Sequence, residues 1–201
     1  MINTGSGSGR AAALHNRCAL FTIIGDAERA IQDCDEAIRL NPNYASAYNN
    51  RGAAHVILGA NARALQDYER ALQLDPNNAI AHNGRCYSLA VVGRAAEALV
   101  NCDRALQLQP NDVNALDSRG YAYLRLGRWA EARRDYDAAI AGNADNAISW
   151  FARAVVRAQQ GDQAGAQADL ATARRIRADI DTDAARGSLI APALGAPSQP
   201  Q

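Results

Sequence analysis

The sequence contains no lysine, so all of its basic side chains are arginines. This absence excludes a Schiff-base lysine and a phosphate-loop lysine. The 21 basic and 21 acidic residues leave no net charge, so the chain lacks the basic footprint of a nucleic-acid-binding protein. No apolar run approaches the roughly 20 residues needed to cross a bilayer, and we therefore expect no membrane insertion.

The first residues of the chain lack the basic and apolar regions of a secretory signal. They are polar and rich in glycine, and we expect residues 1–10 to be flexible. If the sequence is the whole native chain, the cytoplasm is the default compartment. If it is a trimmed piece of a longer protein, the compartment is open, with the periplasm as the alternative.

What the sequence does contain is a strict interval of 34 residues. Glycines keep this interval at Gly25, Gly59, Gly93, Gly127 and Gly161. One alanine series runs from Ala30 to Ala166 and another from Ala37 to Ala173. Self-similarity at a fixed period means that each unit is one supersecondary element that buries its apolar face by stacking on its neighbours.

Each unit is expected to be a helix of about 14 residues, a turn at the glycine and a second helix of similar length. The units are 11–44, 45–78, 79–112, 113–146 and 147–180. Pro42, Pro76 and Pro110 end the second helices of the first three units. Ala144 and Ala178 replace proline in the last two, which predicts softer helix ends there. Residues 181–201 are expected to form a mostly disordered tail, with a short helix possible over 184–190.

These residues resemble the tetratricopeptide repeat family. The match is clearest over 45–78, which carries Tyr48, Gly52, Gly59, Ala64, Tyr68, Ala71 and Pro76. The resemblance covers residues 11–180. It implies an all-α fold, a right-handed α-solenoid of stacked antiparallel helix pairs, with a concave groove lined by the first helices. It also implies that a segment of another protein binds in that groove. The fifth unit carries more polar residues and is interpreted as the cap.

A third periodic series consists of arginines, and an acidic series follows it sixteen residues later. The predicted structural ion pairs are Arg17 with Asp33, Arg51 with Asp67, Arg119 with Asp135, and Arg153 with Asp169. An arginine at a helix interface needs an anion, because an unpaired buried charge is costly. The alternative interpretation is a row of anion-binding arginines along the groove. The third unit is the exception, because Asn101 cannot neutralise Arg85.

Four cysteines occupy the same two repeat places in the first and third units, as Cys18 with Cys34 and Cys86 with Cys102. The second and fourth units have glycine and tyrosine at these places, which indicates that the paired sites touch and conserve volume. We favour buried free thiols here. Two intra-repeat disulfides are the alternative, if the Cα separation is below about 7 Å. A metal site is poorly supported, because no Cys-x-x-Cys or histidine cluster is present.

The exposed face of the first helices predicts a partner-binding groove. Its residues are His15, Asn16, Asn49, Asn50, Asn83, Tyr87, Asp117, Tyr121, Arg125 and Phe151. Asparagines can hydrogen-bond the backbone of an extended peptide whatever its sequence, and aromatic side chains offer apolar area for anchoring. We expect Tyr87, Tyr121 and Phe151 to act as anchors.

Other functions find less support in the sequence. His15, His55 and His82 lie at different repeat places, and no catalytic arrangement, metal or cofactor is predicted. Family members that grip an acidic chaperone tail use a basic-and-asparagine clamp, which the corresponding places here do not supply. The sequence therefore predicts a non-enzymatic scaffold that binds a protein or peptide segment. The alternative is a self-associating structural module, such as a homodimer.

Overall fold

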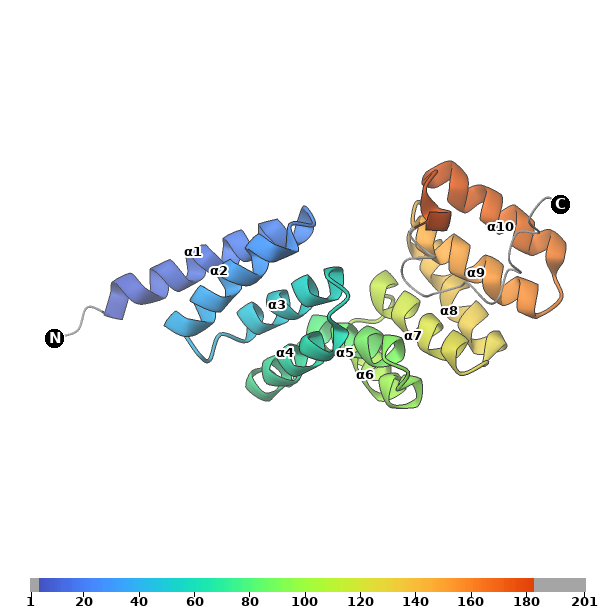
Figure 1. Ribbon diagram of the computed structural model, residues 1–201. Helices are drawn as coiled ribbons and strands as arrows, with labels where there is room; N and C mark the ends of the chain where they lie inside the picture. The colour runs from blue at the N-terminus through green and yellow to red at the C-terminus, as the bar shows by residue number, and fades with distance from the viewer. Residues whose placement is uncertain (1–3, 183–201) are drawn as a thin grey trace. The chain divides into compact units, whose positions relative to one another are not determined.

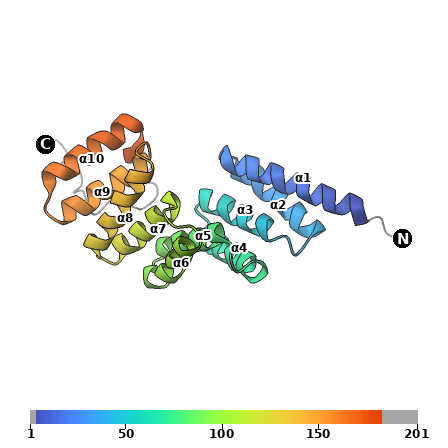
Figure 2. The same ribbon diagram turned by 180° about the vertical axis from the view of Figure 1, so that it is seen from behind.

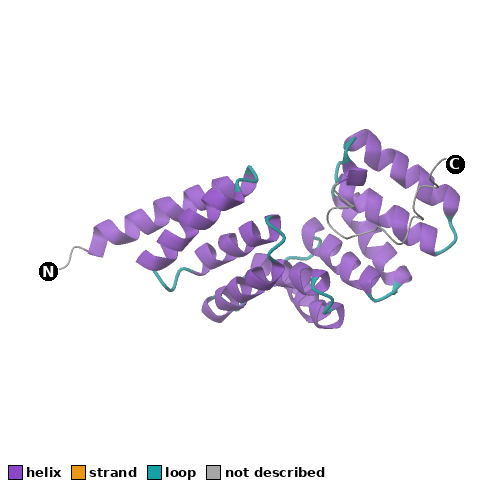
Figure 3. Ribbon diagram, viewed as in Figure 1, coloured by secondary structure: helices purple, strands orange, loops and turns teal. Residues whose placement is uncertain are grey.

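The computed structural model describes residues 4–182, and every regular element within them is a helix (Figure 3). The helices are α1 (Thr4–Ile23), α2 (Ala27–Leu40), α3 (Ala45–Ile57), α4 (Asn61–Leu74), α5 (Ala79–Val91), α6 (Ala95–Leu108), α7 (Val113–Arg125), α8 (Trp129–Gly142), α9 (Ala147–Gln159) and α10 (Gln163–Ile176). They form successive antiparallel pairs, one pair to each repeat (Figure 1). The expected α-solenoid of helix pairs is confirmed.

The chain divides into two compact units, residues 1–109 and residues 110–201. The first, called unit 1, contains α1 to α6, and the second, called unit 2, contains α7 to α10. Figure 2 shows the same helix pairs from behind.

The first helices line the inner face within each unit. In unit 1, α1 contacts α3 and α3 contacts α5, whereas the second helices α2, α4 and α6 make no such contacts with one another. In unit 2, α7 contacts α9, but α8 does not contact α10. First helices that pack on each other across repeats are closer together than second helices, so the stack curves toward them. We call the surface of α1, α3 and α5 the inner face of unit 1.

The turns confirm the prediction drawn from the glycine period. All five periodic glycines have positive φ, from 70° to 87°. This left-handed conformation is easily adopted by glycine and strains residues with a side chain. The helix in front of each turn therefore ends at the same place in every repeat.

The ends of the second helices differ from the expectation in one respect. α8 and α10 end at the same repeat place as α2, α4 and α6, although Ala144 and Ala178 replace proline after them. Asn143 and Arg177 are extended at these ends, just as Asn41 is before Pro42. The same extended exit therefore forms with or without the proline, and the positions of the helix ends do not differ as the expectation of softer ends would suggest.

The N-terminal prediction also needs correction. Residues 1–10 were expected to be flexible, yet α1 begins at Thr4. The alanines at 11–13 favour the helix, and extending an existing helix costs less than starting one, so the glycines upstream can be included. At the other end, Ile180 is buried beside the last repeat, so order continues to the edge of the predicted tail. The tail beyond residue 182, including the possible helix over 184–190, lies outside the described residues.

Small side chains form the core where the helices cross. The first alanine series is 0–5% exposed and the second is 0–1% exposed. Tyr68 shows how tightly these crossings pack, because its ring lies against two glycines. A Cβ added to Gly52 would come within 2.9 Å of the ring, and one added to Gly84 within 2.3 Å. Tyr136 lies over Gly120 in the same way, at 3.0 Å. The predicted contact between these paired sites is confirmed.

Candidate binding surface on the first helices

Four of the periodic arginines pair with the aspartates predicted for them. The shortest contacts are Arg17 Nε to Asp33 Oδ2 at 2.5 Å, Arg51 Nη2 to Asp67 Oδ1 at 2.5 Å, Arg119 Nε to Asp135 Oδ2 at 2.8 Å, and Arg153 Nε to Asp169 Oδ2 at 2.7 Å. All four aspartates are buried. Each bond joins the first helix of a repeat to its second helix. The hydrogen bonds to Asp67 raise the pKa of Arg51.

A second acidic partner was missed by the sequence analysis. Arg51 Nη1 also contacts Asp35 Oδ1 at 2.6 Å, and Arg153 Nη1 contacts Asp137 Oδ1 at 2.7 Å. Both aspartates precede their arginine by sixteen residues, so they belong to the previous repeat. The signal was visible, because Asp35, Glu69, Asp103 and Asp137 keep the 34-residue interval. These contacts link neighbouring repeats within each unit.

The N-terminal part of the inner face of unit 1 carries a chain of polar contacts. Asn50 Nδ2 on α3 lies 3.1 Å from His15 Nε2 on α1, and His15 Nδ1 lies 3.2 Å from Asn16 Oδ1. The imidazole ring of His15 also packs against Tyr44, with ring centroids 4.7 Å apart. Asn16 is exposed, whereas His15 and Asn50 are half-buried. This cluster offers hydrogen-bonding groups to a ligand beside an aromatic surface.

The other asparagines of the predicted groove are less accessible to a ligand than expected. Asn49 is buried, and Asn83 is half-buried. The Oδ1 atoms of both side chains are enclosed and have no hydrogen-bond partner among the described residues. Tyr87 on α5 is half-buried as well. The asparagines of the predicted groove therefore do not form a uniform row of exposed amides, because the side chain of Asn49 is buried.

Asp117 is the acidic residue of the predicted groove, and it lies on α7, a first helix of unit 2. Its carboxylate accepts hydrogen bonds from Ser149 Oγ and from Asn146 Nδ2, each at 2.7 Å. No cation pairs with it among the described residues. Burial raises the pKa of Asp117 to about 6, although the two hydrogen bonds oppose the change. The Asp117 carboxylate thus connects α7 to the start of α9 by hydrogen bonds, without a cation among the described residues to balance its charge.

The structure corrects the predicted aromatic anchors of unit 2. Tyr121 is 3% exposed and Phe151 is 4% exposed, so neither side chain is available to a partner. Arg125 is exposed, and its Nη1 donates to the Tyr121 hydroxyl at 3.0 Å. Large aromatic side chains withdraw from water wherever neighbouring helices can cover them. The position of these residues on a helix face could not by itself show that neighbouring helices cover their side chains.

The cysteines also differ from the favoured expectation. Cys18 is joined to Cys34 and Cys86 to Cys102, with Cα–Cα distances of 5.6 and 5.2 Å. Both bonds cross from the first helix of a repeat to its second helix, and all four residues are completely buried. The preference for free thiols was wrong, because the close approach of the two helices brings the paired cysteines within bonding reach.

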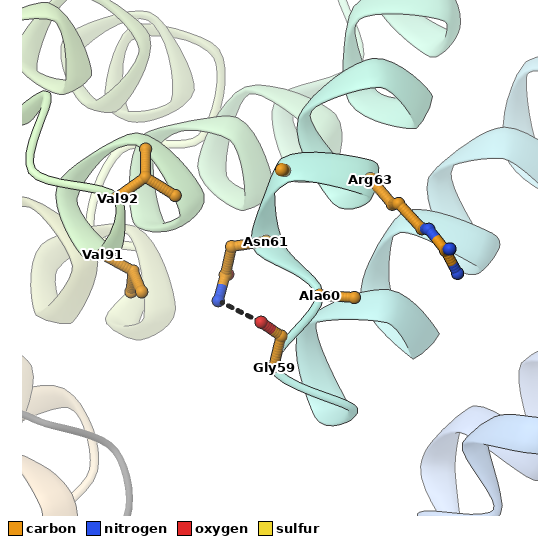
Figure 4. A pocket seen from close by; sticks show the side chains of 7 residues that line it. Gly59, Ala60, Asn61, Arg63, Val91 and Val92 are labelled. Carbon is orange, nitrogen blue, oxygen red and sulfur yellow. Dashed lines mark hydrogen bonds between the residues drawn. The ribbon is translucent and has the colours of Figure 1, made fainter.

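A hollow of about 450 Å³ lies beside the turn between α3 and α4 and the end of α5. It is lined by Gly59, Ala60, Asn61, Ala62, Arg63, Val91 and Val92. Figure 4 shows the side chain of Arg63 pointing away from the two valines, and Asn61 Nδ2 donates to the Gly59 carbonyl at 3.3 Å. The lining residues offer no acid–base pair, so the hollow has no evident catalytic chemistry.

The histidines do not form a common site. His55 Nε2 lies 3.7 Å from Asp67 Oδ2, and burial lowers the pKa of His55. His82 Nε2 lies 3.0 Å from the Pro76 carbonyl oxygen. Over residues 4–182, no group of three potential metal ligands comes together. The helices of this part of the chain are also too short or too polar to cross a membrane.

Comparison with known families decides what these stacked pairs are. Four models match: Tetratricopeptide repeat over residues 45–78, 101–134 and 118–180, and TPR repeat over residues 20–59. The chain belongs to the tetratricopeptide repeat family. Members of this family are in general non-enzymatic interaction scaffolds. The fold of this tetratricopeptide repeat protein indicates a protein-interaction scaffold in general.

Solved structures share the fold at low sequence identity. YrrB, a tetratricopeptide repeat protein, is 23% identical with a TM-score of 0.61, covering 88% of this chain and 91% of its own. MamA from Desulfovibrio magneticus RS-1 is 19% identical with a TM-score of 0.67, covering 86% and 97%. Another MamA structure is 16% identical with a TM-score of 0.66, covering 89% and 96%. No curated protein matches the chain.

Proposed function

We propose that this tetratricopeptide repeat protein binds an extended segment of another protein on its first helices, with the inner face of unit 1 as the main contact surface. The observation that carries the proposal is the packing of α1, α3 and α5 on one another, which places residues from three repeats on one surface. A peptide laid across that surface would meet several polar contacts at once.

The residues of this surface suit a peptide backbone. Asn16 is exposed, and Asn50 and His15 stand beside it with the ring of Tyr44. Amides both donate and accept hydrogen bonds, as a peptide backbone does. YrrB is described as having an unusual peptide-binding site, which supports the same type of ligand for this chain. Tyr87 is the remaining candidate anchor among the three aromatic residues first proposed.

The test is selection of 12-residue peptides from a display library on the full chain, followed by affinity measurements with synthetic peptides. The double variant Asn16→Arg, Ala53→Arg places two bulky cations on α1 and α3. We expect it to weaken binding by at least about 10-fold, because each long side chain covers part of the peptide path. Affinity would be measured by isothermal titration calorimetry.

The matched control places the same charges on the second helices. Gln32 and Gln66 are exposed residues of α2 and α4 at equivalent repeat places. The variant Gln32→Arg, Gln66→Arg should bind the selected peptides as the wild type does. Failure to select any peptide, or equal loss in both variants, would contradict binding on the inner face.

Self-association is a second candidate function, and one observation favours it. Leu20, Ile23 and Ile24 near the end of α1 are 61%, 80% and 70% exposed. In the next repeat, Ala54 takes the place of Leu20 and is buried. Among the described residues no earlier repeat covers this apolar surface, and a second copy of the chain could do so.

Light scattering coupled to size exclusion tests this candidate across a range of concentrations. If self-association is the function, the wild type will run as a dimer and the variant Ile23→Ser, Ile24→Ser as a monomer with an unchanged helical spectrum. A monomeric wild type at high concentration would exclude it.

A further inference from the structure

Apolar side chains are exposed at the turns of unit 1. Each first helix of this unit ends on two aliphatic residues at the same repeat places, and five of these six residues are 41% to 80% exposed. Ile23 and Ile24 are the most exposed, whereas Val91 is half-buried. We call this row the turn edge of unit 1, and it consists of Ile23, Ile24, Ile57, Leu58, Val91 and Val92.

The turns themselves do not require these aliphatic residues. The same two places are occupied by Arg125 and Leu126 in the fourth repeat and by Gln159 and Gln160 in the fifth. The glycine that follows nevertheless has positive φ in all five repeats, so the turn is the same with polar residues before it. Exposed side chains also contribute little to the core. The aliphatic row of unit 1 therefore indicates an interaction surface, as exposed apolar patches generally do.

The turn edge has the size and the chemistry of the centre of an interface. Residues 22–25, 57–62 and 89–93 contain no acidic or basic side chain. The exposed parts of the aliphatic side chains amount to roughly 500 Å², close to the largest apolar patch that a monomer normally exposes. A stable interface covers about 800 Å² on each partner, and its centre is more apolar than its rim.

The turn edge contains both a projecting part and a recess. Ile23 and Ile24 project at the turn of the first repeat. The hollow of about 450 Å³ lies two repeats further on, between the two valines of the third repeat and the turn residues 59–62 (Figure 4). Arg63 points away from the valines, so its charge does not face them. A surface with an apolar projection and an apolar recess is complementary to a second copy of itself.

We propose that two copies of the chain associate through their turn edges, with Ile23 and Ile24 of each copy placed in the hollow of the other. A two-fold axis produces this arrangement, because each residue then meets the same partner residue from both sides. The first repeat of one copy faces the third repeat of the other, and the second repeats face each other at the axis. Stacked helices are about 10 Å apart, so the three turns form a row roughly 20 Å long.

This inference rests on self-association, the second candidate function, and names the surface that self-association uses. It does not depend on peptide binding by the inner face of unit 1, because the turn edge lies at the ends of the first helices.

The test places opposite charges on the two sides of the inferred contact. Ile23→Arg and Val92→Glu each introduce an ion into an apolar contact that occurs twice in the dimer. We expect either variant alone to raise the Kd of the dimer by at least about 100-fold.

Mixing the two variants should restore association. In a heterodimer the new arginine of one copy meets the new glutamate of the other, and the second contact has wild-type residues on both sides. We expect the mixture to dimerise with a Kd within about 10-fold of the wild type. Sedimentation velocity measures the association, and native mass spectrometry identifies the heterodimer by its mass.

Two controls are matched to these variants. A mixture of Ile23→Arg with Val92→Arg places like charges in the same contact and should remain monomeric. Val100→Arg changes a valine that is 73% exposed on α6, outside the turn edge, and should dimerise as the wild type does. The altered side chains are all exposed, so every variant should keep the helical circular dichroism spectrum of the wild type.

The outcomes separate this inference from the functions proposed above. A wild type that stays monomeric at high concentration refutes self-association and the paired turn edges together, whether a helix of another protein or a lipid surface then covers the edge. A dimer that persists in both charged variants, or that opposite charges do not restore, overturns only the paired turn edges. Peptide binding is measured separately by calorimetry, and Ile23→Arg should bind the selected peptides as the wild type does.

Discussion

Reduction of the two disulfides is expected to lower the thermal midpoint of the protein steeply. Each bond joins cysteines sixteen residues apart, and a loop of this length contributes about 3 kcal/mol in the chain-entropy model. The two loops do not overlap, so together they contribute about 6 kcal/mol. This is a large share of the roughly 5–15 kcal/mol by which a protein is usually stable. Thermal unfolding followed by circular dichroism, with and without dithiothreitol, measures the difference.

The control is a variant in which all four cysteines are replaced by alanine. It should be less stable than the oxidised wild type, and dithiothreitol should not change its thermal midpoint. Thiol titration of the denatured wild type should find no free thiols before reduction and four after it. If full reduction leaves the midpoint unchanged, the cross-links do not contribute to stability.

The disulfides also bear on where the protein acts. Such bonds persist in oxidising compartments and are rare in the reducing cytosol. The lack of an evident secretory signal favoured the cytoplasm. With the cysteines paired in the structure, we propose an oxidising compartment, such as the periplasm, instead. Trapping of thiols in intact cells of the native host would show whether the cysteines are oxidised there.

Replacing Asp117 by asparagine is expected to stabilise the protein at neutral pH. The pKa of Asp117 is raised from 3.8 to about 6, because burial opposes its charged form. Between about pH 4 and pH 6 the folded protein retains a proton that the unfolded chain has released, so the contribution of Asp117 to stability falls as pH rises. At pH 7 the carboxylate costs roughly 3 kcal/mol relative to its neutral form.

Asparagine can keep both hydrogen bonds of Asp117. Its oxygen can accept from Asn146 Nδ2, and its amide can donate to the Ser149 hydroxyl, which also acts as an acceptor. Urea unfolding at pH 4, 5, 6 and 7 should show the variant gaining on the wild type as pH rises. Asp145→Asn, at an exposed position of the same unit, should show no such gain. A constant difference across this pH range would contradict the raised pKa.

Much of the fold could be predicted from the sequence, because its information is periodic. The turn glycines require left-handed backbone, and the alanine series require close helix crossings, whatever lies elsewhere in the chain. The pairing of the arginine and aspartate series could also be predicted, because sixteen residues separate a position on the first helix from the facing position on the second. The second acidic partner of Arg51 was equally periodic, but it belongs to the previous repeat and was overlooked.

The period alone determined that residues 11–180 form five helix pairs, because a pattern of turns and small residues specifies each pair locally. The tertiary structure decided which side chains remain accessible: it buried Tyr121 and Phe151, enclosed Asp117, and brought the cysteines within bonding reach. Burial and disulfide formation depend on distances between elements and on what covers each side chain. Those distances arise only when the helices pack, so the spacing of residues along the sequence does not give them, even for two cysteines of one repeat.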